Sequence, residues 1–244
     1  MATNNVVELH GVTRRFGAVA AVDRLSLEVR QGEIMGFLGT NGAGKTTTIK
    51  LMLGFTHPDE GTVSILGGAP ERPATRRRIG YMPETAYYYP YLNIHELLRF
   101  YGGICGMDTA TIRARSARLI GRVGLADAGR RLLRHYSKGM LQRAGIAQAL
   151  LHDPDLLILD EPITGLDPLA RIQFRDLLLE LRGEGKTIFF SSHELSEAEL
   201  ICDRVAILKH GALVWCGAVH EVAGDGAQNL ERIFLRQLGE EVAP

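Results

Sequence analysis

Residues 39–47 read GTNGAGKTT, and the interpretation of the whole chain starts from this stretch. It matches the pattern G-x-x-x-x-G-K-[ST], with the required residues at Gly39, Gly44, Lys45 and Thr46. Glycines here let backbone N–H groups converge on phosphate oxygens without a clash from a Cβ atom, and the following helix presents the positive end of its dipole. Lys45 can reach the β- and γ-phosphates of a nucleoside triphosphate, and the Thr46 hydroxyl can ligate Mg²⁺. Because an apolar strand precedes the loop and a helix follows it, a phosphate-binding loop is favoured over an ordinary glycine turn.

Two acidic residues end the apolar stretch LLILDEP, residues 156–162. Neighbouring residues of a strand point to opposite faces, so Asp160 and Glu161 are expected to have different roles. Asp160 suits the Mg²⁺ shell of an enzyme with a phosphate loop. Glu161 suits a general base that polarises the attacking water. The simpler alternative, that both acids only end a strand, is weak beside a phosphate-binding loop.

Two later segments combine local structural signals with candidate functional residues. In TGLDP, Asp167 precedes a proline, as expected for an N-cap followed by proline at the first helical position. In SSHELSEAE, His193 follows a β-rich run at the start of a helix, where a contact with a γ-phosphate is credible. Ser191 and Glu194 have capping-box spacing, so helix capping can explain part of the same segment.

The bulk composition is that of an ordinary globular protein. The chain has 244 residues, of which 45% are hydrophobic and 23% are charged. Its formal net charge is zero, so no overall field favours nucleic acid. Three cysteines without C-x-x-C spacing argue against a zinc site or a disulfide framework. The start MATNNVVELHG lacks the features of a signal peptide, and the apolar runs are too short to cross a bilayer, so we expect a soluble cytoplasmic protein.

The order of strand and helix signals predicts an α/β fold with a helical insertion. The N-terminal part carries the alternation and the β-branched residues typical of strands. Strand signals disappear between about residues 85 and 151, where helical periodicity dominates. Strands and helices alternate again afterwards, which implies parallel pairing with sites at the carboxyl ends of the strands. We predict one domain over residues 1–244: a P-loop NTPase core with a mostly parallel sheet and an N-terminal antiparallel β part (1–84 and 152–220), an inserted helical lobe (about 85–151) and a short C-terminal helical tail (221–244).

A second anion-binding signal lies in HYSKGMLQR, residues 135–143. Ser137, Lys138 and Gly139 come just before an apolar-periodic run, which predicts a helix start whose N–H donors point outward. The residues alone leave open whether Ser137 is only a helix cap or also a phosphate clamp.

Together, and in this order, the motifs resemble those of the ATP-binding subunit of an ABC transporter, and the resemblance covers nearly the whole chain. The phosphate loop, LLILDEP, the GLD turn and the SSH histidine match the family pattern. YSKGMLQR lies where the family has its signature segment; Ser137 and Gly139 agree with that pattern, whereas Lys138 and Met140 replace the most familiar Gly and Gln. The resemblance implies that this segment covers a γ-phosphate held by the phosphate loop of a facing subunit.

The resemblance also implies ATP and Mg²⁺ as cofactors and assigns roles to individual residues. ATP would lie against Phe16, Gly39, Thr40, Asn41, Gly42, Ala43, Gly44, Lys45, Thr46 and Thr47. The ATP of the facing subunit would lie against the signature residues Ser137, Lys138, Gly139 and Met140. Catalysis would depend on Glu161 and His193, Mg²⁺ on Thr46, Glu84 and Asp160, and the family's D-loop would contain Asp167.

Two of these assignments depend on position more than on residue type. Phe16 occupies the place where the family stacks an aromatic ring on adenine, although a solitary phenylalanine near a turn could also be a core residue. Glu84 stands where the family usually has glutamine. A carboxylate can ligate Mg²⁺ directly or through water, but it adds a negative charge beside the phosphates.

A tyrosine cluster, Tyr87, Tyr88, Tyr89 and Tyr91, follows Glu84. Tyrosine is enriched at interfaces, and in this family the neighbouring groove receives a short helix of the membrane partner. An ordinary packed turn is the alternative.

The function implied is an ATP-hydrolysing subunit that dimerises around ATP–Mg²⁺ and powers transport through a separate polytopic membrane permease. The expected location is therefore the cytoplasmic face of the cell membrane, and the expected partners are the permease and a second nucleotide-binding subunit, with a homodimer favoured and no nucleic acid. The SKGM segment and Glu84 resemble export-type subunits. The alternative is a soluble mechanical ATPase of the same family that acts on nucleic acid or ribosomes. Such relatives usually carry two cassettes or long coiled-coil inserts, and this sequence has neither.

Overall fold

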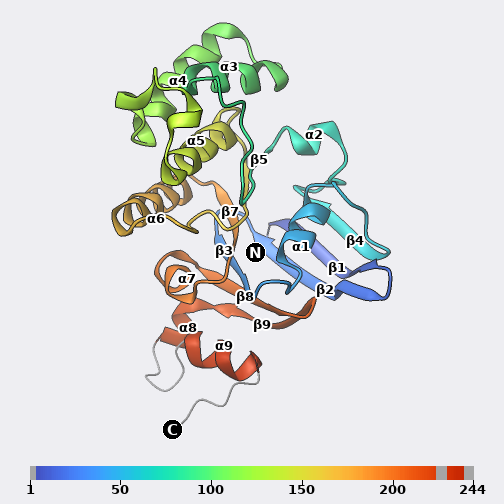
Figure 1. Cartoon of the computed structure of the whole chain (residues 1–244). Coiled ribbons are helices and arrows are strands. Elements are labelled where there is room, and N and C mark those ends of the chain that lie inside the picture. The colour runs from blue at the N-terminus through green and yellow to red at the C-terminus, as the bar shows by residue number, and fades with distance from the viewer. Residues whose placement is uncertain (1–3, 224–229, 239–244) are drawn as a thin grey trace.

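Six strands form the central sheet of the protein in this computed structural model, which describes residues 4–223 and 230–238. Their order is β5–β6–β7–β3–β8–β9, and only β9 runs antiparallel to its neighbour (Figure 1). The strands are β3 (Ile34–Gly39), β5 (Ile79–Met82), β6 (Leu156–Leu159), β7 (Thr187–Ser192), β8 (Arg204–Lys209) and β9 (Ala212–Ala218). Every residue of β3, β6 and β7 is buried, as parallel strands covered on both faces require.

A smaller antiparallel sheet of order β2–β1–β4 lies beside the central one. Its strands are β1 (Asn5–Phe16), β2 (Val19–Arg30) and β4 (Glu60–Ile65). Along the second half of β2, buried and exposed residues alternate, so one face of this sheet is apolar. That face packs against helix α1 (Lys45–Met52) and one side of the central sheet. The predicted fold class, a mostly parallel α/β core with an N-terminal antiparallel part, is confirmed.

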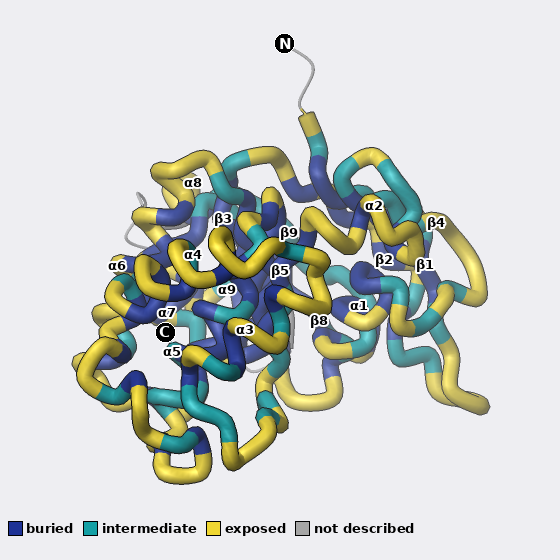
Figure 2. The backbone as a smooth tube through the Cα atoms, turned by 90° about the horizontal axis from the view of Figure 1, so that it is seen from above, coloured by how far each residue is buried: buried dark blue, intermediate teal, exposed yellow. Residues whose placement is uncertain are grey.

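The two faces of the central sheet belong to two different apolar clusters. On β3, Met35 and Phe37 contribute to the cluster with α1 and the antiparallel sheet, whereas Ile34 and Leu38 contribute to the other. The second cluster includes residues of α6 (Pro168–Gly183), α7 (Leu195–Ile201) and the C-terminal helix α9 (Leu230–Leu238). Figure 2 shows the buried segments gathered around the central strands, with exposed segments at the periphery. Successive side chains of β3 therefore point alternately into the two apolar clusters, so this one strand contributes to both.

Three helices, α3 (Ile94–Ile104), α4 (Thr109–Arg122) and α5 (Lys138–Leu150), lie together at the top of Figure 1, away from the antiparallel sheet. Each begins at a side-chain cap: Asn93 forms a capping box with Glu96, and Asp108 and Ser137 accept from N–H groups of the next turn. Short helical turns precede and connect them: α2 (Pro73–Arg76), η1 (Ala126–Ala128) and η2 (Leu133–His135). No described helix has the length and apolarity needed to cross a membrane.

The C-terminal segment contains α8 (Val219–Ala223) and α9, and Leu230 and Phe234 are buried. Of the segment 221–244 that was predicted as a helical tail, residues 224–229 and 239–244 lie outside the described residues.

The helical lobe is joined to the core by a close approach of α5 to β5. A Cβ atom on Gly80 of β5 would overlap the carbonyl oxygen of Ala149 and would lie 2.7 Å from Cδ2 of Leu157 and 2.9 Å from Cγ of Pro154. The lobe can therefore rest on the sheet at this point only because residue 80 has no side chain.

Gly80→Ala is expected to lower the free energy of unfolding by about 1–3 kcal/mol, because the added methyl group overpacks this junction. Urea or thermal unfolding measures the change. Gly183→Ala is the matched control, since nothing lies within 4 Å of the position where its Cβ would be. Equal stability of the two variants would contradict this account of the junction.

Candidate nucleotide-binding site

A cavity of about 410 Å³ lies at the carboxyl ends of the central strands and brings together residues from five separate segments, one of which is Ala21 of β2. Its lining includes the phosphate loop that follows β3, the residues after β6 and β7, and Glu84 after β5. The lining residues are Ala21, Thr40, Asn41, Gly42, Ala43, Gly44, Lys45, Thr46, Thr47, Glu84, Glu161, Thr164 and His193. Most of the predicted site residues thus lie together at the carboxyl ends of the parallel strands.

The phosphate loop has the backbone that the glycine pattern predicts. Gly44 has φ of 105°, in the left-handed region, and a Cβ there would overlap the carbonyl oxygen of Ala21. Helix α1 starts directly after it, and no side chain caps its N-terminus. The first turn of α1 therefore presents N–H groups and the positive dipole end to the cavity, which suits a phosphate.

Glu161 is the centre of a buried charged cluster. Its Oε1 atom lies 3.1 Å from Nζ of Lys45, and its Oε2 atom lies 2.8 Å from Nδ1 of His193. The side chains of Lys45 and Glu161 are only 6% and 9% exposed. Lys45 also donates to the carbonyl oxygens of Gly39 at 2.6 Å and Thr40 at 3.3 Å. The ammonium is thus held between the loop that would bind phosphate and the carboxylate that would act as base.

Asp160 lies behind the cavity rather than in its lining. It is 2% exposed, and its Oδ1 atom accepts a hydrogen bond of 2.6 Å from the Ser191 hydroxyl. The same hydroxyl oxygen accepts from the Glu161 N–H at 2.9 Å. Burial and the negative charge of Asp160 raise the pKa of Tyr81 to about 12. Asp160 and Glu161 therefore have different surroundings, as expected for neighbours at the end of a strand.

The capping-box interpretation of Ser191 is wrong. Helix α7 begins after Glu194, which makes no side-chain cap, and it is the Ser192 hydroxyl that accepts from the Glu194 N–H at 2.9 Å. Ser191 instead joins Asp160 to the backbone of Glu161. The alternation of side chains on β7, which turns Ser191 and Ser192 to opposite faces, is the signal that could have separated the two serines.

The donors at this edge fit the chemistry of Mg²⁺. Thr46 and Glu84 line the cavity with a hydroxyl and a carboxylate, and Asp160 lies next to Glu161. Mg²⁺ prefers oxygen ligands and is usually held by one or two carboxylates together with substrate phosphates and waters. Over residues 4–223 and 230–238, no group of three or more His, Cys, Asp or Glu side chains could hold a metal ion. The ion would therefore depend on nucleotide phosphates as ligands.

Phe16 lies at the end of β1 and is 54% exposed, so it is not a core residue. The Arg14 guanidinium lies 5.0 Å from the centre of its ring. Phe16 is not among the residues that line the phosphate cavity. Its stacking on adenine stays a prediction.

The signature segment lies outside this cavity. Ser137 is the N-cap of α5, with its hydroxyl accepting from the Met140 N–H at 3.2 Å, and none of Ser137, Lys138, Gly139 and Met140 lines the cavity. Ser137 and Lys138 are both exposed. Asp167 caps α6 through a bond of 2.9 Å from the Ala170 N–H, as its place before a proline predicts. One chain thus has two separate helix starts suited to anions.

Sequence reasoning missed two contacts around Glu161. The Thr164 hydroxyl donates to Oε2 of Glu161 at 3.2 Å, and Nε2 of the buried Gln142 donates to the Thr164 carbonyl oxygen at 2.9 Å. A hydroxyl three residues after an acid is too common to single out in a sequence. Gln142 is far away along the chain, and no local pattern connects it to Thr164.

Comparisons with known proteins give matches to the ATP-binding proteins of ABC transporters. A family model described as ABC transporter matches residues 22–164. An uncharacterized ABC transporter ATP-binding protein of Nostoc sp. is 48% identical over 84% of this chain and 62% of its own length. A similarly named protein of Synechocystis sp. is 46% identical over 91% of this chain and 65% of its own length, so the chain spans less than two thirds of both relatives.

The chain is also similar to a protein named for export and to a solved ATP-binding subunit. The Nod factor export ATP-binding protein I of Ralstonia nicotianae is 38% identical over 89% of this chain and 68% of its own length. A solved structure described as the ATP binding subunit of an ABC transporter is 31% identical, covers 96% of this chain and 99% of its own, and superimposes with a TM-score of 0.86.

Lys45→Ala is expected to weaken binding of an ATP analogue by about 10- to 100-fold, because one charged hydrogen-bond donor to the phosphates is lost. Isothermal titration calorimetry gives the dissociation constants. Lys50→Ala is the control, since Lys50 is exposed at the far end of the same helix. An unchanged affinity for Lys45→Ala would refute the role assigned to this ammonium.

Proposed function

The chain belongs to the ABC transporter ATP-binding family, whose domains hydrolyse ATP to power transport, and we propose that it is such an ATP-hydrolysing subunit and drives transport through a separate membrane protein. The observation that carries this proposal is the cluster of Lys45, Glu161 and His193 at the rim of the phosphate loop. It combines a phosphate-binding cation, a buried carboxylate and a second phosphate contact within one cavity.

The residues of the cluster divide the work of hydrolysis. The loop N–H groups and Lys45 hold the β- and γ-phosphates. Thr46, Asp160 and Glu84, together with the phosphates, would hold Mg²⁺, which would neutralise phosphate charge. Glu161 accepts a proton from the water that attacks the γ-phosphorus, while the bond to the leaving oxygen of ADP breaks. His193 keeps Nδ1 on Glu161 and leaves the opposite edge of its ring for the γ-phosphate.

Two copies of the chain are proposed to complete each other's sites. The exposed Ser137 at the start of α5 cannot serve the cavity of its own chain, since it is not part of its lining. Its hydroxyl and the N–H groups of the first turn are suited to a phosphate presented by another molecule. A head-to-tail pair would place each signature segment over the γ-phosphate held by the facing subunit, which closes both sites with the same contacts.

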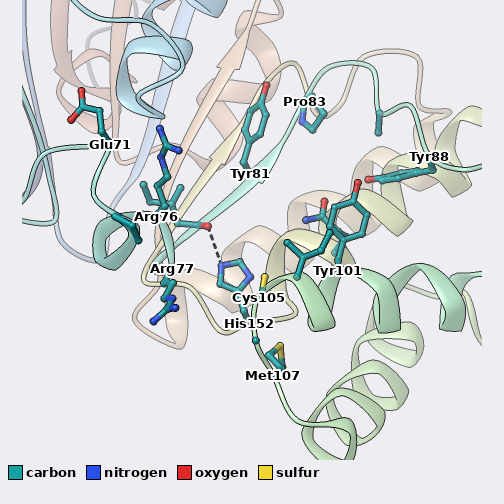
Figure 3. Close-up of a pocket in the computed structure, with 16 residues that line it drawn as sticks. Glu71, Arg76, Arg77, Tyr81, Pro83, Tyr88, Tyr101, Cys105, Met107 and His152 are labelled. Carbon is teal, nitrogen blue, oxygen red and sulfur yellow. Dashed lines mark hydrogen bonds between the residues drawn. The ribbon is translucent and has the colours of Figure 1, made fainter.

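A second cavity, of about 790 Å³, is proposed as the docking groove for the membrane partner (Figure 3). It lies between the core and the helical lobe, and its wall includes Arg76, Tyr81, Tyr101 and Ile104. Large apolar side chains around it are exposed, among them Ile104 at 67% and Tyr87 at 93%. An apolar surface of this kind beside a groove suits a short amphipathic helix of a protein partner.

Export is the proposed direction of transport. Nod factor export ATP-binding proteins I of four further organisms are 38–40% identical to this chain, and its SKGM segment and Glu84 resemble those of export-type subunits. The alternative, a mechanical ATPase that acts on nucleic acid or ribosomes, is not favoured, because the relatives named here are described as transporter or export proteins.

Glu161→Gln is expected to lower kcat for ATP hydrolysis by about 10²- to 10⁴-fold while ATP still binds, because the amide cannot accept the proton of water. The variant should also accumulate as a dimer in ATP, since the bridging γ-phosphate is not removed. A phosphate-release assay and size-exclusion chromatography measure the two effects. Glu60→Gln, at an exposed position on β4, is the control. A Glu161→Gln protein that remains monomeric in saturating ATP would contradict the proposed pairing.

Ile104→Glu is expected to reduce co-purification of the proposed membrane partner by at least about tenfold, since a charge would enter an apolar contact. Leu200→Glu is the control, because Leu200 is 60% exposed and lies on α7, outside the groove. Thermal unfolding of both variants checks that the fold is retained. Equal recovery of the membrane protein with both variants would argue against docking at this groove.

A further inference from the structure

We propose that Thr164 is a positioning residue for Glu161. We further propose that Gln142, on helix α5, holds the backbone of Thr164 in place. Gln142 lies within YSKGMLQR and Thr164 begins TGLDP, but none of the roles assigned to those segments includes either side chain. The inference rests on the proposed hydrolysis of ATP and concerns how its base is oriented.

The Glu161 carboxylate has three side-chain partners among the described residues. Lys45 contacts Oε1 at 3.1 Å, while His193 and the Thr164 hydroxyl contact Oε2 at 2.8 and 3.2 Å. Lys45 and His193 are the groups that the proposed function directs to the phosphates. The Thr164 hydroxyl has no such competing duty, so it is the partner that stays with Glu161 when ATP is bound. A carboxylate that must accept a proton from one water molecule needs such a fixed orientation.

The backbone of the turn is shaped for this contact. Glu161 has φ of 48°, in the left-handed region that non-glycine residues seldom adopt. The Thr164 N–H then donates to the Glu161 carbonyl oxygen at 3.2 Å and closes the turn. Because of this reversal, the side chain of Thr164 returns over the side chain of Glu161. The left-handed backbone of Glu161 thus makes possible the contact between the Thr164 hydroxyl and the Glu161 carboxylate.

Helix α5 holds the same turn from the other side. Gln142 is 6% exposed, and its Nε2 atom donates to the Thr164 carbonyl oxygen at 2.9 Å. The Lys138 side chain lies across Gly165, since a Cβ on that glycine would be 2.6 Å from Nζ. A Cβ on Gly139 would lie 3.2 Å from Leu166.

The beginning of α5 therefore rests on residues 164–166, and Lys138 has a contact within its own chain. Any displacement of α5 is transmitted to the Thr164 backbone through the Gln142 bond, and from there to the Glu161 carboxylate. Ser137 starts this helix and is proposed to touch the nucleotide of the facing subunit. The position of α5 therefore couples that contact to the orientation of Glu161 in the same chain.

Thr164→Val tests the hydroxyl, since valine keeps the shape and removes the donor. In the full chain together with its membrane partner, kcat for ATP hydrolysis should fall about tenfold, while KM and the dissociation constant for ATP stay within about twofold. Thr164→Ser restores the hydroxyl and should recover kcat to within about threefold of the wild type.

Thr187→Val is the matched control for the same chemical change. Its hydroxyl is also buried and accepts a hydrogen bond, from the Gly32 N–H at 2.9 Å, but it lies at the opposite end of β7 from His193. A wild-type kcat in Thr164→Val, or an equal loss in Thr164→Ser, would overturn the role of the hydroxyl. A wild-type complex that does not hydrolyse ATP at all would instead refute the proposed function.

Gln142→Met tests the link to α5, because methionine has a similar length and lacks the N–H donor. It should lower kcat with little change in ATP affinity. In the double variant with Thr164→Val, kcat should stay within about twofold of the kcat of the slower single variant. Losses of kcat that multiply in the double variant would show that the two residues act independently and would overturn the link.

Discussion

The site depends on one buried ion pair, between Lys45 at the start of α1 and Glu161 after β6. Neither charge could be buried alone without a penalty of several kcal/mol, so each is retained because the other is there. The pair joins the segments that follow β3 and β6, and β7 lies between these two strands. β7 in turn contributes Ser191, which hydrogen-bonds Asp160 and the Glu161 N–H, and is followed by His193, which contacts the Glu161 carboxylate.

Helix α5 connects this edge to the helical lobe by contacts along its whole length. Near its C-terminus, the backbone at Ala149 closes on Gly80 of β5, where a side chain would not fit. In its middle, Gln142 holds the turn that carries Thr164. At its N-terminus, Ser137 and Lys138 are exposed. The helix therefore rests on the sheet near its C-terminus and on the turn that carries Thr164 nearer its N-terminus, while Ser137 and Lys138 remain exposed, as expected of an element that relays the proposed contact with another subunit.

Part of this arrangement is readable in the sequence because it depends on local geometry. The phosphate loop is a backbone motif, and the positive φ and close approach at Gly44 follow from a glycine in its proper place. The continuous apolar run of β3 indicates a strand buried on both faces, and Asp167 before a proline defines a helix start. The fold class and the family follow from such patterns and their order, since each pattern needs only neighbours along the chain.

The remaining features were decided by tertiary structure. The assignment of Ser191 to a helix cap was wrong because the order of the strands brings β7 beside β6 and turns that hydroxyl to Asp160. The contact of Thr164 with Glu161 needs the left-handed backbone at Glu161, and the bond from Gln142 needs α5 to lie on the same turn. The sequence by itself determined which chemical groups are present and the segments that carry them. Only the packing of distant segments decided which of these groups meet, because hydrogen bonds between side chains act over about 3 Å and depend on the position of every element between them.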